Sequence, residues 1–134
     1  LYCRADEGKL RQIILNVLSN AYKYSSQQGG DVLIRPAAPV LAESGPLVGI
    51  VIEDHGMGMQ PEQVERVFER FYRADKSGAI PGTGLGMSIV KELIELLHGK
   101  INIDSTPGAG TVVTLYFPAL PQGAAKDCTS TRQS

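Results

Sequence analysis

The sequence has few of the residues that define specialised classes of protein. Only two cysteines, Cys3 and Cys128, occur in its 134 residues, and they lie near opposite ends. Two cysteines make no disulfide framework, and with two distant histidines they do not complete a zinc site. We therefore expect a reducing compartment, the cytoplasm. The chain begins at Leu1 without a methionine, which favours a piece of a longer protein.

A charge excess and long apolar runs are missing as well. Thirteen basic residues stand against fourteen acidic ones, a net charge of -1. Without a basic field, we expect no binding to nucleic acid through phosphate neutralisation. The apolar runs are only a few residues long, so no segment is expected to span a membrane, and no direct membrane contact is expected. The composition is that of one ordinary soluble globular domain.

Hydrophobic periodicity predicts the order of helices and strands. Apolar residues with a 3.6-residue period predict a helix over 6–26. A second long helix, over 85–97, is apolar nearly all round and should be deeply packed, with Gly99 ending it. Pro61 fits the first turn of a shorter helix that reaches residue 71. Strands are expected at 1–4 (the end of one), 31–35, 47–53, 100–104 and 111–117.

This order predicts an α+β fold in two layers. Helices would cover one face of a mixed, mostly antiparallel sheet. The strands at 31–35 and 47–53 would form a hairpin, joined by a connection over 36–46 that is too rich in Pro and Gly to be regular. Hydrophobic residues thin out after Pro118. We therefore expect one domain over 1–120 and a disordered tail over 121–134.

Two clusters combine polar side chains with places where a ligand could approach. Asn16 and Asn20 lie one helical turn apart and project from the same side. They are either hydrogen-bonded structural amides or oxygen ligands for Mg²⁺. Asp54-x-Gly56-x-Gly58 follows the strongest strand, where glycines permit a tight loop and close approach of a ligand. The alternative for this second cluster is a simple acidic turn.

Two further clusters follow along the chain. Phe68 and Phe71 are spaced as core anchors, and Arg73 just beyond them is either a phosphate contact or a solvated side chain. Residues 82–86, Gly-Thr-Gly-Leu-Gly, open the second long helix. Free N–H groups at a helix N-terminus bind phosphate, so this cluster indicates an anion site. It matches neither the P-loop nor the usual dinucleotide fingerprint.

Taken together, the motifs N-x-x-x-N, D-x-G-x-G, F-x-x-F and G-x-G-x-G, in this order and spacing, resemble a known family. They are similar to the catalytic and ATP-binding domain of bacterial sensor histidine kinases, in the GHKL superfamily of gyrase, heat-shock chaperone and MutL-like ATPases. The resemblance covers about residues 6–117. It implies the Bergerat-type ATP-binding fold, a mobile ATP lid over 72–83, and phosphate transfer in two-component signal transduction.

The resemblance also implies a role for each motif. Asn20 would coordinate the Mg²⁺ that bridges the phosphates of ATP, supported by Asn16, and Asp54 would accept the adenine amino group. Asn16, Lys23 and Arg73 would be the catalytic residues. Tyr24 would pack on the adenine or ribose. The nucleotide would be bound by Asn16, Asn20, Lys23, Tyr24, Asp54, Gly56, Gly58, Tyr72, Arg73, Gly82, Thr83, Gly84, Leu85, Gly86 and Thr111.

One position bears on the reaction. Members of the superfamily that hydrolyse ATP carry a Glu four residues before the metal-binding Asn, where this chain has Asn16. A neutral amide is a poor base, which favours transfer to a protein nucleophile over hydrolysis. Neither His55 nor His98 has the sequence context of the family's phospho-acceptor histidine. Two alternatives to a sensor histidine kinase domain share the same fold. They are a degenerate nucleotide-binding scaffold and an anti-sigma-type serine/threonine kinase.

The resemblance implies partners outside this chain. The acceptor histidine would lie on the protein's own upstream dimerisation domain, and a response regulator would receive the phosphate indirectly. Because dimerisation belongs to that helical domain, the isolated chain is expected to be a monomer. It would work in the cytoplasm, either free or as the cytoplasmic part of a membrane-bound sensor.

Overall fold

The computed structural model describes residues 7–28, 31–43, 45–69 and 86–119. Three helices and four strands lie in these ranges, in the order that the sequence predicts. Their bounds are α1 Glu7–Gln28, β1 Leu33–Ala42, β2 Gly45–Asp54, α2 Pro61–Arg66, α3 Gly86–Leu96, β3 Lys100–Thr106 and β4 Gly110–Pro118.

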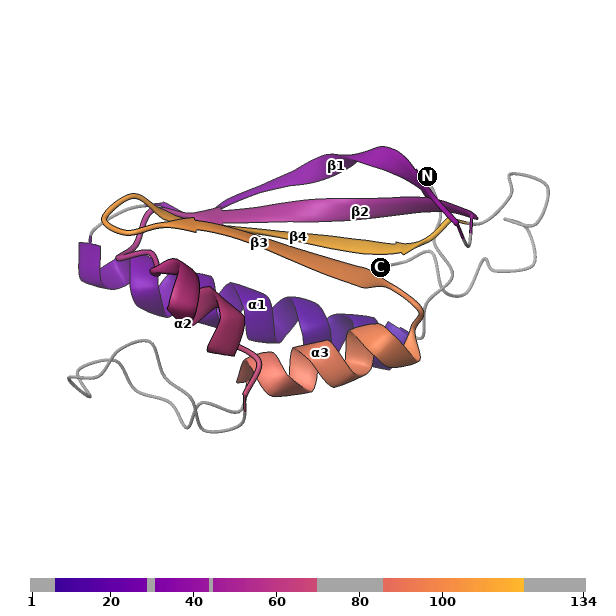
Figure 1. The fold of residues 1–134 in the computed structure, drawn as a ribbon, viewed down its shortest axis with the longest axis horizontal. Coiled ribbons are helices and arrows are strands. Elements are labelled where there is room, and N and C mark those ends of the chain that lie inside the picture. Colours follow the sequence, from indigo (N-terminus) through magenta and orange to yellow (C-terminus); the bar gives the residue numbers. More distant parts are fainter. Residues whose placement is uncertain (1–6, 29–30, 44, 70–85, 120–134) are drawn as a thin grey trace.

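The four strands form one sheet with the order β1-β2-β4-β3. All three pairings in this described sheet are antiparallel, so it shows no mixed character. The helices lie together on one face of the sheet (Figure 1). The predicted two-layer α+β architecture is therefore confirmed, and the strands at its start form the predicted hairpin.

The core lies between the helices and the inner face of the sheet. The apolar stripe of α1 is buried as its period predicts, with Ile13 and Val17 at its centre. Val90 of α3 and Leu115 of β4 complete this centre, and both are fully buried. Each buried Leu, Ile or Val contributes about 1.5–3 kcal/mol to folding. This core fixes α1 and α3 against the sheet.

The helix predicted over 85–97 is deeply packed on one side but not on the other, although it is apolar nearly all round. Ile89 is 38% exposed and Leu96 is 62% exposed, whereas Val90 and Ile94 are buried. The helix contacts α1 on one side and the sheet on another, so its remaining surface faces away from the core. An apolar residue on a helix does not have to be buried, because much of any protein surface is apolar.

The connection expected over 36–46 is mostly strand. β1 continues through Pro36 and Pro39 to pair with β2, and its register shifts between Ala37 and Val40. Proline cannot donate to a ladder and is found on edge strands and at bulges, and β1 lies at the edge of the sheet that the described residues form. The prolines therefore mark an irregular edge, not the end of the strand.

The helix that begins at Pro61 is shorter than predicted. It ends at Arg66 rather than at residue 71. After it, the N–H of Val67 donates to the carbonyl of Val64, three residues back, at 3.3 Å. This tighter turn ends the α-helical ladder. Proline at the first turn is as predicted.

The end of α3 also differs in detail from the prediction. Gly99 was expected to end the helix, but it is His98, with φ 58°, that takes the left-handed conformation at the helix end. The N–H of His98 donates to Glu95 at 3.1 Å, and that of Gly99 donates to Ile94 at 2.9 Å, which is a Schellman motif. Gly99 is needed for another reason. A Cβ there would lie 2.4 Å from the carbonyl oxygen of Tyr116.

Several predicted features lie outside the described residues. They are the strand end at 1–4, the lid over 72–83 and the tail over 121–134. No helix within the described ranges combines the length and the apolar character needed to cross a membrane.

Candidate functional site

One end of the molecule gathers several of the predicted site residues that the structure describes. The C-terminal ends of α1 and β2 lie there, with α2 and the turn that joins β3 to β4 (Figure 1). Asp54 is the last residue of β2, and its cross-strand partner on β4 is Thr111. The fold therefore brings together residues that are 57 positions apart in the sequence.

Asp54 is a buried carboxylate held by backbone N–H groups. It is only 7% exposed. Its Oδ1 accepts from the N–H of Gly56 at 2.9 Å and from that of Thr111 at 3.3 Å. Burial raises the pKa of Asp54, while the two hydrogen bonds act in the opposite direction. A desolvated acceptor of this kind is suited to a ligand that offers an N–H donor.

The loop after Asp54 contains a glycine, Gly58, that no other residue can replace without strain. Gly58 has φ +67°, and a Cβ there would lie 2.0 Å from the carbonyl oxygen of Thr106. Across the loop, the N–H of Gly108 donates to the carbonyl of Met57 at 2.7 Å. The loop is thus packed backbone to backbone against the β3–β4 turn. This close packing gives Gly58 a role in placing the loop.

Gly110 performs a similar function on β4. Its φ is +127°, and a Cβ would lie 2.1 Å from the carbonyl oxygen of Asp54. The backbone of β4 can therefore approach β2 closely enough for Thr111 to bond Asp54. The Gly-Thr pair is a geometric requirement of the carboxylate site.

Ser105 is a site residue that the sequence prediction missed. Its Oγ accepts from the N–H of Met59 at 2.8 Å and donates to the carbonyl of Gly110 at 3.1 Å. It also lies 2.8 Å from Oγ1 of Thr111. A polar residue that continues the inward row of Ile101 and Ile103 was the signal that could have identified it.

The two asparagines of α1 both lie near Gly86 at the start of α3, on the same side of their helix. Nδ2 of Asn16 donates to the carbonyl of Gly86 at 3.5 Å, and its Oδ1 accepts from Gln12 at 3.3 Å. Oδ1 of Asn20 lies 4.0 Å from the position of a Cβ on Gly86. Both amides are half-buried. Asn16 therefore has hydrogen-bond partners, and Asn20 places an amide oxygen beside the first residue of α3.

The donor set here fits one mode of metal binding. The described residues contain no group of three or more His, Cys, Asp or Glu that could hold a metal ion. A Mg²⁺ ion bound through one amide oxygen, ligand phosphates and water needs no such group. The oxygen of Asn20 meets that requirement, so these residues fit a Mg²⁺ ion brought by a phosphate ligand.

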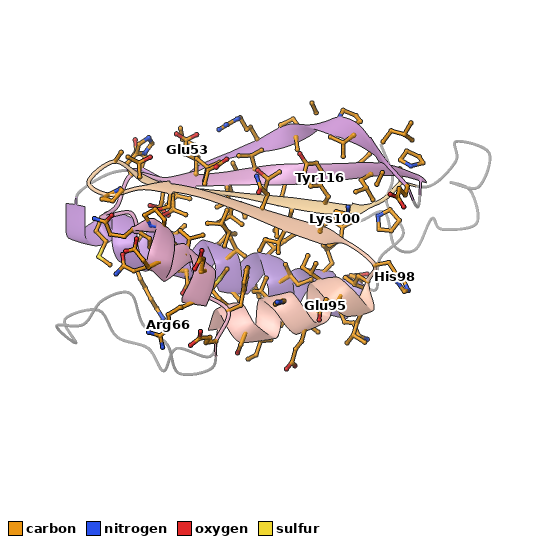
Figure 2. All side chains as sticks on the ribbon, viewed as in Figure 1. Glu53, Arg66, Glu95, His98, Lys100 and Tyr116 are labelled. Carbon is orange, nitrogen blue, oxygen red and sulfur yellow. The ribbon has the colours of Figure 1, made fainter. Side chains whose placement is uncertain are left out.

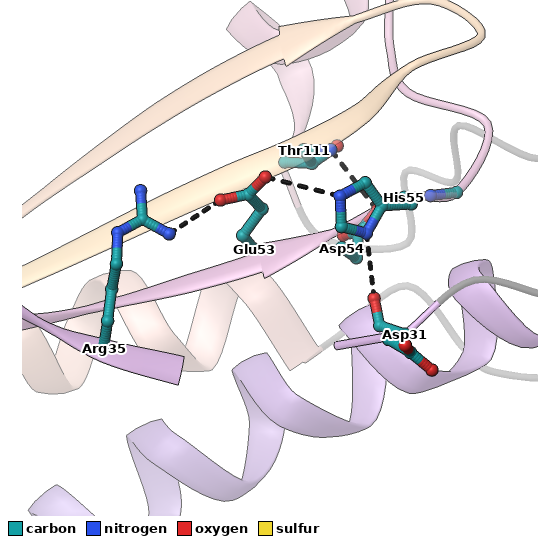
Figure 3. A network of polar contacts seen from close by, with 7 residues as sticks. Asp31, Arg35, Glu53, Asp54, His55 and Thr111 are labelled. Atoms are coloured by element: carbon teal, nitrogen blue, oxygen red, sulfur yellow. Dashed lines mark hydrogen bonds and ion pairs between the residues drawn. The ribbon is translucent and has the colours of Figure 1, made fainter. Parts of the chain in front are cut away.

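A second polar network lies on the other face of the sheet. Glu53 accepts from the guanidinium of Arg35 at 2.7 Å and lies 3.4 Å from Nε2 of His55 (Figure 3). Nδ1 of His55 lies 3.0 Å from the carbonyl oxygen of Asp31. Figure 2 shows Glu53 on the side of the sheet away from the helices. The hydrogen bond from Arg35, opposed by slight desolvation, lowers the pKa of Glu53.

The segment after α2 is held against the core by apolar and cationic contacts. Val67 and Phe68 pack against the core cluster, as core anchors should. Nζ of Lys91 on α3 lies 5.5 Å from the ring centroid of Phe68. This is within the range of a cation–π interaction.

Lys23 is a predicted site residue that the structure describes, and it is half-exposed in α1. The predicted site residues not yet placed lie outside the described part of the structure, and they include the side chain of Tyr24. The remaining predicted positions without a described structure are Phe71, Tyr72, Arg73, Gly82, Thr83, Gly84 and Leu85.

Comparison with known proteins places this geometry in a family. The family model described as histidine kinase-, DNA gyrase B- and HSP90-like ATPase matches residues 5–121. The chain belongs to this ATPase family. Its sheet, its helix layer and its motif order agree with that membership, and the resemblance seen in the sequence is confirmed.

Among curated proteins, this ATPase domain is similar to sensor histidine kinases. WalK of Bacillus subtilis (strain 168) is 40% identical over 120 residues, which are 88% of this chain and 19% of that protein. SenX3 of Mycolicibacterium smegmatis is 42% identical over 118 residues, 87% of this chain and 29% of that protein. The chain thus spans less than a third of the length of these two relatives.

Solved structures of histidine kinases are also similar to this chain. The mycobacterial sensor histidine kinase MprB has a TM-score of 0.73 at 33% identity, covering 90% of this chain and 78% of that one. Full-length ShkA, crystallised in complex with AMPPNP, has a TM-score of 0.71 at 34% identity. That match covers 92% of this chain and 25% of ShkA.

Proposed function

We propose that this chain is the catalytic domain of a sensor histidine kinase, which binds Mg²⁺ and ATP and transfers the γ-phosphate to a histidine of another domain. The observation that carries the proposal is the buried carboxylate of Asp54, held by two backbone N–H groups in a domain of this ATPase family. The similarity to full-length ShkA, solved in complex with the ATP analogue AMPPNP, supports binding of a nucleotide.

Asp54 would select adenine. Both of its hydrogen bonds within the described residues end on Oδ1, which leaves Oδ2 for the exocyclic amino group of the base. Guanine would direct a carbonyl oxygen at the same carboxylate, and two acceptors repel. A site built to bond one donor rejects an analogue that lacks it by a large factor. Gly56, Gly58 and Thr111 would form the backbone wall beside the base.

The phosphates would lie between α1 and the start of α3. Asn20 would hold a Mg²⁺ ion that, when bound, neutralises phosphate charge during transfer. Asn16, Lys23 and Arg73 would orient the phosphates and stabilise the charge on the transferred group. Residues 82–86 and the N-terminus of α3 would present backbone N–H groups to the anion. The aromatic rings of Tyr24 and Tyr72 would contact the base or ribose.

Transfer would be favoured over hydrolysis. Asn16 stands where a general base for water would be needed, and its amide oxygen accepts from Gln12 and cannot take a proton at neutral pH. The acceptor histidine would lie on the protein's own dimerisation domain, with a response regulator next in the relay. The isolated chain would then be a monomeric cytoplasmic domain that binds ATP and phosphorylates itself poorly.

Calorimetric titration tests the proposal. We expect saturable binding of AMPPNP that strengthens with Mg²⁺, and much weaker binding of the guanine analogue GMPPNP. A matched assay adds a separately purified dimerisation domain with its histidine and follows transfer from radiolabelled ATP. Absence of binding by the folded chain would contradict the proposal and favour a degenerate scaffold. Label on serine or threonine would instead favour the anti-sigma-type kinase.

A further inference from the structure

Ser105 joins three separate segments at the carboxylate site. Its Oγ meets the N–H of Met59 in the glycine loop, the carbonyl of Gly110 and the hydroxyl of Thr111 at 2.8, 3.1 and 2.8 Å. Ser105 is the cross-strand partner of Thr111, which in turn is the partner of Asp54. The three side chains therefore form one row across β3, β4 and β2, on the face that the helices cover.

The direction of each hydrogen bond in this row follows from the supply of protons. A serine hydroxyl has one proton and two lone pairs. The N–H of Met59 takes one lone pair, and the carbonyl of Gly110 can only accept, so it takes the proton. If Ser105 donated to Thr111 instead, its oxygen would face the Gly110 carbonyl oxygen at 3.1 Å without a proton between them. Only donation by Thr111 makes all three contacts hydrogen bonds.

This assignment fixes what Thr111 offers to a ligand. Its proton points at Ser105, so its oxygen presents only lone pairs elsewhere. That oxygen belongs to a residue whose own N–H bonds Asp54. Because Thr111 and Asp54 are cross-strand partners on the same face of the sheet, a hydroxyl oxygen and a carboxylate would both accept from the same edge of a bound ligand. Such a pair attracts an amino group and repels a carbonyl oxygen, because the hydroxyl cannot turn to donate without losing its bond to Ser105.

We propose that Ser105 is a positioning residue that locks the Thr111 hydroxyl as an acceptor and thereby excludes purine nucleotides with an oxygen at C6. The inference rests on the proposed function, because it concerns the base that the site accepts. It assigns part of the selectivity to a serine that touches no ligand. Asp54 alone would discriminate less, since a freely turning Thr111 hydroxyl could donate to the oxygen of a 6-oxopurine.

A purely structural role for Ser105 predicts a different result. If Ser105 only ties the glycine loop to β4, its loss weakens the site for every nucleotide by the same factor. If it also orients Thr111, its loss weakens ATP and spares or improves ITP, which differs from ATP by an oxygen in place of the 6-amino group. The ratio of the two affinities therefore separates the two roles.

The experiment measures the affinities of ATP and ITP for the wild-type chain and four variants. We expect Ser105→Ala to lower ATP affinity about three- to tenfold and the ATP:ITP preference about fivefold. Ser105→Thr keeps the hydroxyl and should restore the preference. Thr111→Val removes the acceptor and should lower the preference as Ser105→Ala does. Thr114→Val, which removes a hydroxyl from the other face of β4, is the matched control and should change neither value.

The outcomes are distinguishable. Equal losses for ATP and ITP in Ser105→Ala would overturn the inference and leave the proposed function intact. A wild-type chain that binds neither nucleotide would overturn the proposed function, and the inference with it. If Ser105→Ala does not fold, Ser105→Cys serves in its place, because a thiol is a weak hydrogen-bonding group of nearly the same shape. An unchanged ATP:ITP ratio in Ser105→Cys would again overturn the inference.

Discussion

Glu53 and Asp54 are neighbours in β2, but their carboxylates lie in opposite environments. Glu53 lies on the outer face of the sheet, where Arg35 and His55 are close to its oxygens. Asp54 points to the helix side, and its partners are two backbone N–H groups. Accordingly, the pKa of Glu53 is lowered, chiefly by its bond from Arg35, and the pKa of Asp54 is raised by burial.

The difference separates a structural carboxylate from one that is available to a ligand. The charge of Glu53 is already compensated by side chains, and water screens it further. Asp54 is desolvated without a positive side chain bonded to it in the described structure, so it retains the capacity to bond a donor. Perturbed carboxylates of this second kind gather at functional sites. The alternation of side chains along one strand is enough to create both environments.

The largest effect is expected from Asp54→Asn. The Asn oxygen can keep the bonds to the backbone N–H groups, but its NH₂ group would face the adenine amino group. We expect ATP affinity to fall about 100-fold or more, with the domain still folded, because a buried donor is left facing a donor. Calorimetry gives the affinity and thermal unfolding gives the stability. Wild-type affinity in this variant would remove Asp54 from the site.

The next largest effect is expected from Gly58→Ala. A Cβ would lie 2.0 Å from the carbonyl oxygen of Thr106, and φ is +67°. We expect a loss of about 2–3 kcal/mol of unfolding free energy, measured by urea denaturation. Gly108→Ala is the matched control, because its φ is +80° but nothing lies within 4 Å of its Cβ. It should lose only about 1 kcal/mol, from backbone strain alone. Equal losses would contradict the close packing of the loop.

Acidification should change the contributions of Asp54 and Glu53 to folding stability in opposite directions. The raised pKa of Asp54 gives a contribution to stability that is present below its ordinary pKa and is lost as pH rises through the folded value. The lowered pKa of Glu53 gives a contribution that is present above its ordinary pKa and is lost as pH falls through the folded value.

These contributions can be separated by urea unfolding between about pH 3 and pH 7. Relative to wild type, Asp54→Asn should gain stability toward neutral pH, and Glu53→Gln should lose it there. Parallel pH profiles for both variants would contradict the assignment. ATP affinity should fall a few-fold on acidification, since a protonated Asp54 offers a poorer acceptor. This fall should be absent in Asp54→Asn.

The smallest effect is expected from Glu53→Gln on nucleotide binding. The side chain faces away from the site, and its ion pair with Arg35 is solvent-exposed. ATP affinity should stay within about twofold of the wild-type value at neutral pH. A tenfold loss would show that the outer network supports the loop that carries Asp54, and would end the distinction between the two faces.

Much of the fold was predictable because its signals are local. The period of Ile13 and Val17 predicted the buried face of α1, and Asp54 with its glycines marked the loop after β2. Errors arose where tertiary context overrides such signals. The prolines of β1 looked like a loop because the sequence does not reveal which strand will be an edge. His98 took a conformation expected of glycine because the Schellman bonds stabilise it.

The candidate site was predictable only where glycines and polar residues cluster. Ser105 is a lone polar residue in a strand, and its importance depends on Met59, Gly110 and Thr111, which the fold brings to it. Periodicity places a residue on a face, but it does not give the direction of a hydroxyl proton. That information comes from distances between atoms and from the count of donors and acceptors.

The irregular outer edge of β1 has a consequence for the behaviour of the protein at high concentration. Ile34 is 56% exposed and Leu41 is 84% exposed on this strand, which would invite sheet-to-sheet polymerisation in a flat edge. Pro36 and Pro39 have no N–H to offer an added strand, and the register shift between Ala37 and Val40 makes this edge irregular. The same features that made β1 hard to recognise therefore oppose the addition of a further strand at this edge of the described sheet.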